Sequence, residues 1–269
     1  MPFLSIEGAT LHYDEEGDGP PMLFCSSTAT HGDVWKFHQT GFFSRTHRVI
    51  TFDQRGTGQS ITSWQDFSTK RLAADAALLL AHLGAQPAVV CGHSNGGRVA
   101  QYLAVEHPDA VARLVLMSSG GDSGAQGIPL NLCKEMFALG YDPWVRDQAI
   151  RLGFTREYVE ANLEDLERFL AVRLAAPPSL DTYLRHVLGR QEFNLGERIK
   201  RIEAPTLVMV GEDEDRGPPG HITHCAYARR LSAEIPNARF VMLKGQAHCY
   251  YYSDPYTTNQ VISDFINGS

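Results

Sequence analysis

The sequence predicts an α/β fold in which helices cover both faces of a mainly parallel sheet. Short apolar runs of strand length alternate with longer stretches of helical periodicity, which is the pattern of consecutive βαβ units. The alternation stops over residues 118–201, where the patterns are helical, and then resumes. A chain of 269 residues has room for one α/β domain with an insertion. We therefore expect a core domain of residues 1–117 and 202–269, and a helical cap, or lid, of residues 118–201.

Composition and charge exclude several classes of protein. The chain is 43% hydrophobic, enough for a substantial core, so the whole chain is not disordered. With 24 Lys and Arg against 31 Asp and Glu, the net charge is −7, which argues against nucleic acid as a partner because phosphate binding requires clustered basic side chains. No signal peptide or run of 18 apolar residues is present, so we expect no membrane partner.

The cysteines indicate the cellular compartment. There are five, an odd number, without a C-x-x-C pair or a regular spacing, at Cys25, Cys91, Cys133, Cys225 and Cys249. This usage is typical of reduced thiols, since disulfides persist in oxidising compartments. We therefore expect a cytoplasmic protein.

The N-terminal third is expected to form strands. Residues 3–6 and 9–13 alternate between apolar and polar side chains around a turn at Glu7-Gly8, which predicts a hairpin. Residues 21–25 and 48–52 are short apolar runs, compatible with strands that are buried on both faces.

Strands and helices then alternate. A helix with apolar residues at helical spacing is expected from about Thr69 to Leu83, and Gly84 ends it. The elements expected after it are a strand at 88–91, a helix from about 95 to 106, a strand at 114–117 and, beyond the insertion, a strand at 206–210, a helix from about 224 to 235, a strand at 240–243 and a last helix ending near 266.

The insertion itself carries helical patterns. Apolar residues recur at 4-3-4-4 spacing, as on one face of a helix, at Val159, Leu163, Leu166, Leu170 and Leu174. Pro177-Pro178 ends this pattern, and a second helix is expected over residues 180–188. A helical insertion in a βαβ chain is expected to lie over one end of the sheet.

The segment Gly92-His93-Ser94-Asn95-Gly96-Gly97 follows a predicted strand directly and begins a helix. A G-x-S-x-G motif in this strand–turn–helix context is a nucleophile elbow, which exposes the serine hydroxyl at a sharp turn. Glycine neighbours tolerate the strained backbone, and the N–H groups at the helix start stabilise an anion there. Ser94 is the predicted nucleophile; the alternative is a Ser N-cap beside packing glycines.

A serine hydroxyl is a poor nucleophile until a base takes its proton. Of the eleven histidines, His248 follows the last predicted strand by a short loop, where its side chain can reach across the carboxyl edge of the sheet. His93 is next to the nucleophile, but we expect its side chain to point away from Ser94 and to pack. His248 is therefore the predicted base.

The third member of such a triad is expected to be a carboxylate after the strand at 206–210. The sequence there reads Gly211-Glu212-Asp213-Glu214-Asp215. Like charges so close together raise one another's pKa, so these side chains cannot all be buried and ionised. We expect most of them to be solvated.

With these motifs, the chain resembles the α/β-hydrolase superfamily over essentially its whole length. It is similar to the branch of single-domain esterases, enol-lactonases and non-haem haloperoxidases, whose D-x-R-G-x-G-x-S loop is matched by Asp53-Gln54-Arg55-Gly56-Thr57-Gly58-Gln59-Ser60. The chain order of serine, acid and histidine is also that of the fold. The resemblance implies an α/β-hydrolase fold with a mainly parallel sheet of roughly eight strands.

The resemblance also ranks the acids. The family usually has its acid three residues after the glycine that ends the strand, with prolines beyond, and counting from Gly211 this implies Glu214, with Pro218-Pro219 beyond. Aspartate is usual at this position, so the longer glutamate requires a slightly retracted backbone. The alternatives are, in order, Asp215, Asp213 and, after the sixth strand, Asp122.

The oxyanion hole departs from the family pattern. The usual His-Gly after the third strand is replaced by Ser26-Ser27, counted back from Trp35. The resemblance then implies the Thr28 N–H as the first donor and the Asn95 N–H as the second, and one such donor is worth ~10²–10³ in rate. The candidate substrate contacts are Ser27, Trp144 and Tyr250.

His221, His224 and Cys225 raise the question of a zinc site, but they have no carboxylate at ligand spacing, so we expect no metal and no cofactor. The expected reaction is hydrolysis of a small-molecule carboxylic ester or lactone by acyl transfer. The alternatives are cleavage of a C–C bond in a β-diketone-type substrate or of an amide by the same triad, and a ligand sensor with slow turnover. The oligomeric state is left open.

Overall fold

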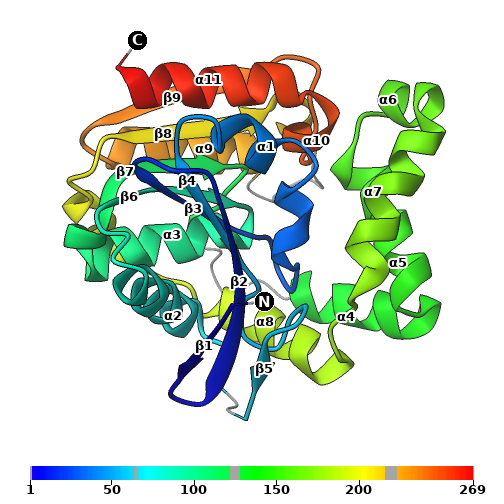
Figure 1. Cartoon of the computed structure of the whole chain (residues 1–269). Helices are drawn as coiled ribbons and strands as arrows, with labels where there is room; N and C mark the ends of the chain where they lie inside the picture. The colour runs from blue at the N-terminus through cyan, green and yellow to red at the C-terminus, as the bar shows by residue number, and fades with distance from the viewer. Residues whose placement is uncertain (1, 64–65, 122–127, 216–222, 269) are drawn as a thin grey trace.

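The computed structural model describes residues 2–63, 66–121, 128–215 and 223–268, and for residues 128–133 it describes the backbone alone. These residues fold around a central nine-stranded sheet (Figure 1). Its strands are β1 (Phe3–Ile6), β2 (Ala9–Glu16), β3 (Pro21–Cys25), β4 (Arg48–Phe52), β5 (Ile61–Thr62), β6 (Ala88–His93), β7 (Val111–Met117), β8 (Thr206–Gly211) and β9 (Ala238–Leu243). They lie in the order β1-β2-β4-β3-β6-β7-β8-β9, and β5 pairs with β2.

Most of the sheet is parallel. β3 lies between β4 and β6 and is parallel to both, and parallel pairing continues through β7 and β8 to β9. β1, β2 and β5 form an antiparallel end, where β2 also pairs with β4. The expected mainly parallel sheet of roughly eight strands is confirmed. Because the parallel strands share one direction, the loops that leave their carboxyl ends meet at one edge of the sheet.

Helices cover both faces of the sheet. The helices of the core are α1 (Gln39–Phe43), α2 (Thr69–His82), α3 (Asn95–Glu106), α9 (His224–Glu234), α10 (Tyr250–Ser253) and α11 (Pro255–Asn267). One apolar core joins the sheet to α2, α3 and α9, and a second joins its other face to α1 and α11. The side-chain alternation of β3 separates the two, with Leu23 and Cys25 in the first and Met22 and Phe24 in the second. No described helix is both long and apolar enough to cross a lipid bilayer.

Between residues 118 and 201 the described chain forms helices and no strand. They are α4 (Ile128–Leu139), α5 (Tyr141–Gln148), the π-helix η3 (Ala149–Gly153), α6 (Arg156–Ala161), α7 (Leu163–Ala175), α8 (Leu180–Gln191) and the short 3₁₀ helix η4 (Gly196–Arg201). Figure 1 shows α4 to α7 set to one side of the sheet. The Thr69 hydroxyl donates to the Gly189 carbonyl at 3.2 Å, so α8 is tied to the start of α2.

The elements lie within a few residues of the predicted ones, with one clear difference in the insertion. The apolar pattern of residues 159–174 is divided between α6 and α7, because Asn162 leaves the helical conformation with φ −134° and ψ 45°. Leu163, which the pattern assigns to the buried face, is 60% exposed. The prediction of one continuous buried face is therefore wrong at this point, and it is correct from Leu166 to Leu170, which are buried.

Candidate active site

Ser94 lies at the sharp turn between β6 and α3, with φ 56° and ψ −116°, a strained conformation for a residue with a side chain. Its backbone N–H donates to the Met117 carbonyl at 2.9 Å, which fixes the turn against β7. The turn also needs glycine: a Cβ at Gly96 would lie 2.1 Å from the Cys25 carbonyl oxygen. The start of α3 therefore lies directly against the end of β3, and Ser94 is next to the loop that follows it.

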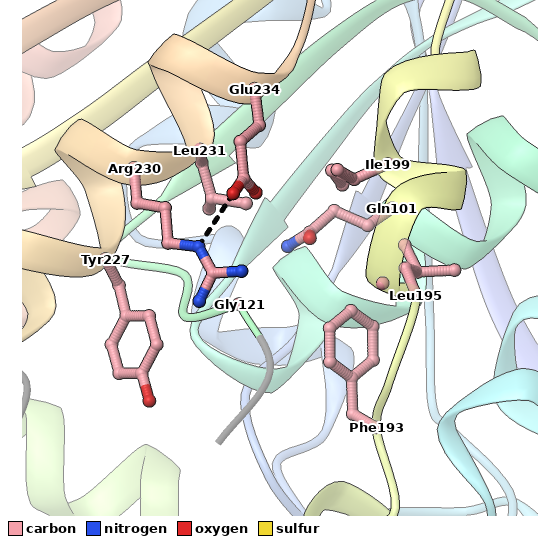
Figure 2. Close-up of a pocket in the computed structure, with 10 residues that line it drawn as sticks. Gln101, Gly121, Phe193, Leu195, Ile199, Tyr227, Arg230, Leu231 and Glu234 are labelled. Atoms are coloured by element: carbon pink, nitrogen blue, oxygen red, sulfur yellow. Dashed lines mark hydrogen bonds and ion pairs between the residues drawn. The ribbon is translucent and has the colours of Figure 1, made fainter. Parts of the chain in front are cut away.

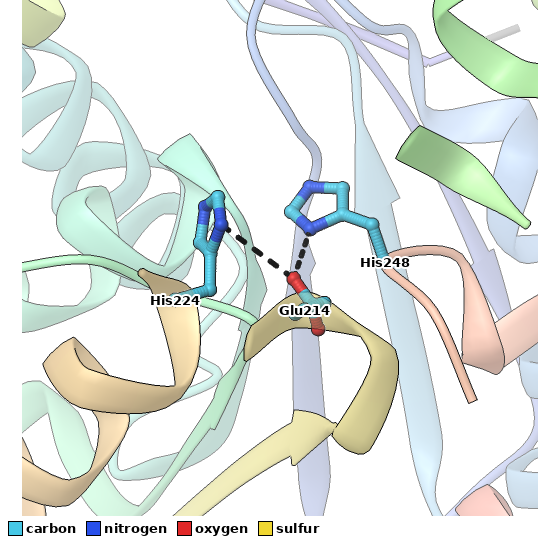
Figure 3. A group of neighbouring side chains, drawn as sticks. All are labelled: Glu214, His224 and His248. Carbon is cyan, nitrogen blue, oxygen red and sulfur yellow. Dashed lines mark hydrogen bonds and ion pairs between the residues drawn. The ribbon is translucent and has the colours of Figure 1, made fainter. Parts of the chain in front are cut away.

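Glu214 lies in the short 3₁₀ turn η5 (Glu212–Asp215) that follows β8, and only 8% of it is exposed. Its Oε1 accepts from the Gly211 N–H at 3.0 Å and from the Ser118 hydroxyl, while its Oε2 accepts from Nδ1 of His248 at 2.6 Å (Figure 3). Burial alone would raise the pKa of Glu214, but the charge and the hydrogen bond of His248 outweigh it and lower the pKa to about 2. The carboxylate is therefore ionised near neutral pH.

Two other acids of this region have described contacts with other partners. The exposed Asp215 accepts from the Thr223 hydroxyl at 2.8 Å, and the backbone N–H of Asp213 donates to the Gln246 carbonyl at 2.9 Å. Asp122, like Pro218, Pro219 and His221, lies outside the described residues. Among the predicted acids, Glu214 has a described hydrogen bond to the histidine.

His248 lies in the loop between β9 and α10, and its side chain is 21% exposed. An ionised carboxylate can only accept, so the hydrogen of the imidazole is on Nδ1 and Nε2 is left as the acceptor. This is the tautomer that a general base at a serine requires. Among the described contacts, no hydrogen bond joins Ser94 to His248, and such contacts often tighten only when the substrate binds.

His93 has a second role beyond the packing that the sequence predicted. It is 1% exposed, its Nε2 lies 2.8 Å from the His248 carbonyl, and its Nδ1 lies 2.7 Å from the Ser27 hydroxyl. Since a carbonyl only accepts, Nε2 carries the hydrogen and Nδ1 accepts from Ser27. Burial lowers the pKa of His93 to about 3, which keeps the ring neutral. His93 therefore joins the loop of His248 to the loop after β3.

The loop after β3 holds the predicted oxyanion donors. Thr28 is buried, and the structure describes no hydrogen-bond acceptor for its backbone N–H or for that of Asn95, the first residue of α3. Two arginines from the insertion hold the loop: Arg190 donates to the Thr28 hydroxyl at 3.2 Å, and Arg173 to the Thr28 carbonyl at 3.5 Å. The Thr28 and Asn95 N–H groups therefore stay the predicted oxyanion donors.

The D-x-R-G-x-G-x-S loop forms hydrogen bonds with the loop after β3. Gln54 donates to the Ser26 carbonyl at 3.0 Å, and Asp53 accepts from the Gly32 N–H at 2.7 Å. Arg55 forms two hydrogen bonds of 2.7 Å with Asp75 of α2, and both side chains are almost fully buried. The motif therefore has a structural part in positioning the loop after β3.

The three predicted substrate contacts lie in different parts of the fold and differ in burial. Ser27 is half-buried beside His93, as described above. Trp144 is buried in α5, with its ring 5.3 Å from that of Tyr183 in α8. Tyr250, the first residue of α10, is fully buried in the second core. A contact of each with substrate stays a prediction.

His224, the first residue of α9, is a neighbour of the site that the sequence did not place there (Figure 3). Its Nδ1 lies 3.7 Å from Oε2 of Glu214, and its ring centroid is 4.9 Å from that of His248. The expectation that His224 has no carboxylate at ligand distance is wrong, because the turn after β8 brings Glu214 back beside the start of α9. Ser118 was also missed, although its position directly after β7 places it at the carboxyl edge of the sheet.

A small cavity lies away from this site, between α9 and the chain around η4 (Figure 2). It measures about 10 Å³, and Gln101, Phe193, Arg230 and Glu234 are among the residues that line it. A volume of this size holds at most about one water molecule. It is too small to hold a substrate.

Comparison with known proteins shows the family. A family model for the alpha/beta hydrolase fold matches residues 20–255. The chain belongs to the α/β-hydrolase family. The predicted superfamily and fold class of this hydrolase are confirmed.

Three similar proteins span nearly the whole length of this hydrolase. The putative carbamate hydrolase RutD of Pseudomonas savastanoi pv. phaseolicola is 27% identical over 260 residues, which are 96% of this chain and 97% of that protein. The enol-lactonase from Burkholderia xenovorans LB400 has a TM-score of 0.87 at 23% identity, over 99% of this chain and 100% of that one, a likeness that shows the fold alone. Est816, described as an N-acyl homoserine lactone degrading enzyme, has a TM-score of 0.81 at 27% identity, over 98% and 100%.

Proposed function

We propose that this hydrolase cleaves a carboxylic ester or a lactone by acyl transfer, with Ser94 as nucleophile, His248 as base and Glu214 as the triad acid. The observation that carries the proposal is the 2.6 Å hydrogen bond between Nδ1 of His248 and the buried Glu214 carboxylate. It holds His248 in the tautomer of a base, at the edge of the sheet where the strained Ser94 turn also lies.

In this reaction Ser94 Oγ attacks the carbonyl carbon while Nε2 of His248 takes its proton. The negative oxygen of the tetrahedral intermediate is held by the backbone N–H groups of Thr28 and Asn95. His248 then donates the proton to the leaving oxygen. Afterwards it takes a proton from the water that attacks the acyl-enzyme, and returns this proton to Ser94 Oγ as the bond to the acyl group breaks and the acid leaves. Glu214 stabilises the imidazolium that forms in both halves of the reaction.

The names of the relatives support two kinds of bond. The likeness to Est816 favours a lactone, and the likeness to RutD makes a carbamate the second candidate, since the same acyl-transfer steps release an amine in place of an alcohol. If none of these bonds is cleaved, the alternatives are cleavage of a C–C bond and ligand sensing with slow turnover. No metal or cofactor enters the proposed steps.

We also propose that residues 118–201 act as a cap over the site. Arg173 and Arg190, which both come from this insertion, hold the loop of Thr28, so the cap is in contact with the proposed oxyanion donors. The proposed partner is a small-molecule ester or lactone, without nucleic acid or membrane. The four cysteines with described side chains are free, which supports a reducing compartment such as the cytoplasm.

Steady-state hydrolysis of short p-nitrophenyl esters, a lactone series and an aryl carbamate tests the proposal. We expect turnover by the unaltered hydrolase and a loss of about 10⁴-fold or more in Ser94→Ala, on the scale of triad deletions. Ser263→Ala, a half-buried serine in α11, is the matched control and should keep full activity. Equal rates for the folded Ser94→Ala variant and the unaltered chain on every substrate would overturn the proposal.

A further inference from the structure

We propose that Glu214, His224 and His248 bind a zinc ion and that this ion switches the hydrolase off. The site itself stands on the geometry of the three side chains (Figure 3). The inhibition rests on the proposed function, because it requires His248 to be the base.

The donor set is one that zinc prefers. Two imidazole nitrogens and one carboxylate oxygen form a common three-residue zinc site with water as the fourth ligand. The three ligand atoms all lie within 4.8 Å of one another. Bonds of about 2.0–2.1 Å in a tetrahedron place ligand atoms about 3.3 Å apart. The observed 3.7 Å from His224 to Glu214 is already close to this value, and the 2.6 Å from His248 to Glu214 must open by less than a bond length.

His224 is a group that the proposed reaction does not use. A serine triad needs one histidine at its acid, and His248 fills that position with its hydrogen bond to Oε2. His224 faces the same oxygen from the other side at 3.7 Å, which is too long for a hydrogen bond. Its side chain is 44% exposed, so this ligand of the proposed site is open to solvent.

Some of the neighbouring groups favour zinc binding, and others weaken it. The other carboxylate oxygen, Oε1, is held by Gly211 and Ser118, which directs Oε2 towards the two histidines. Against this, His224 is at the positive N-terminal end of α9, and the positive charges of Arg98 and Arg190 act on it. We therefore expect reversible binding rather than the retention typical of a structural zinc ion.

Zinc and catalysis exclude each other at this site. The ion takes the place of the hydrogen on Nδ1 of His248, so the neutral ring then carries its hydrogen on Nε2. An Nε2–H group has no lone pair with which to take the proton of Ser94. Bound zinc also occupies the Glu214 oxygen that orients the ring.

Binding is measured first, without reference to activity. The chain is dialysed against a chelator and titrated with Zn²⁺ by calorimetry, and Co²⁺ serves as a visible-absorption probe of the ligand set. We expect one ion per chain, and a loss of affinity of about 100-fold or more in His224→Gln, because even the loss of a partner of a zinc ligand typically costs 10–100-fold. His107→Gln, an exposed histidine outside the site, is the matched control and should bind as the unaltered chain does.

Two binding results would overturn the site. One is equal zinc affinity in His224→Gln and in the unaltered chain. The other is loss of zinc binding in Cys225→Ser with retention in His224→Gln, which would assign the ion to the neighbouring thiol. Ser94→Ala should bind zinc with unchanged affinity, since Ser94 contributes no ligand.

Inhibition is then measured on the ester that the chain turns over best. We expect zinc to stop turnover at the concentrations at which it binds, EDTA to restore it, and His224→Gln to resist zinc relative to its own zinc-free rate. Turnover that continues with the site filled would contradict the role of His248 and leave the site standing. Ser94-dependent turnover without any zinc binding would overturn the site and leave the proposed function standing.

Discussion

The carboxylate of Glu214 shows how a glutamate fits where aspartate is usual. Its longer side chain folds back over its own turn, and Oε1 accepts from the N–H of Gly211, three residues earlier, at 3.0 Å. The hydroxyl of Ser118, the residue directly after β7, donates to the same oxygen. These two contacts hold the extra methylene and leave Oε2 in line with His248.

This arrangement predicts which acidic residue is required for turnover. Glu214→Gln places an amide at the position of Oε2, so His248 loses the acceptor that fixes its tautomer, and we expect kcat/KM for a p-nitrophenyl ester to fall about 10⁴-fold. Asp215→Asn, at the exposed neighbour bound to Thr223, should change it little. A large loss in the Asp215 variant with normal turnover in Glu214→Gln would move the acid to Asp215.

His93 gives a second prediction at the scale of one residue. His93→Phe keeps a ring of similar shape but leaves the His248 carbonyl and the Ser27 hydroxyl without their partner, so we expect the free energy of unfolding to fall by about 1–3 kcal/mol. Because the loop of His248 is then untied, kcat should fall as well. Urea unfolding and steady-state rates measure both effects, with Ser27→Ala as the variant that removes only one of the two contacts. Unchanged kcat in the folded His93→Phe chain would show that the tie has no part in turnover.

At the scale of elements, the approach of α3 to β3 brings Ser94 to the loop that holds the proposed oxyanion donor Thr28. The backbone of Gly96 lies against the carbonyl groups of Cys25 and Ser26. The sequence motif shows that glycine is present at this position. The reason for it, contact with a strand some seventy residues earlier in the chain, is visible only when the two elements are packed.

We therefore expect Gly96→Ala to separate these elements. An added Cβ would lie 2.1 Å from the Cys25 carbonyl oxygen, and overpacking of this kind typically costs about 1–3 kcal/mol. Urea unfolding should show the loss of stability, and labelling of Ser94 by a fluorophosphonate should slow. Gly41→Ala in α1, where an added Cβ meets nothing within 4 Å, is the matched control. Labelling at the normal rate in Gly96→Ala would contradict the expected displacement.

At the scale of the whole molecule, buried polar contacts join the insertion to the core domain. His186 of α8 is fully buried, its Nε2 donates to the Arg55 carbonyl at 3.2 Å, and its ring lies 5.1 Å from that of Phe67. Burial lowers the pKa of His186 to about 4. The neutral ring is therefore part of the contact between the insertion and the Arg55 loop.

This burial predicts how stability depends on pH. The unfolded chain takes up a proton on His186 below about pH 6.5, whereas the folded chain does so only near pH 4, so acid favours unfolding across this window. The stabilisation is complete above pH 6.5 and is lost as the pH falls to 4, by up to about 3 kcal/mol for this group. Urea unfolding at pH 7 and pH 5 measures the slope, which should be shallower in His186→Gln than in the control His107→Gln. Equal slopes in the two variants would contradict the assignment.

The sequence by itself determined the features that depend on residues close together along the chain. Periodicity predicted the strands, the helices and their order, because an apolar period of two or of 3.6 residues is a local property. The strand–turn–helix context predicted Ser94, and the short loop after the last strand predicted His248. The break at Asn162 was missed, since the apolar spacing continues across it.

Only the tertiary structure decided which of several equivalent residues meet. Glu214, Asp213 and Asp215 have the same chemistry within three positions, and the path of the turn after β8 determines which of them reaches His248. His224 and His93 have no local signal for their places, because their partners come from other strands and loops. Contacts between distant segments arise when parallel strands bring their carboxyl ends to one edge, and that convergence is a property of the folded chain.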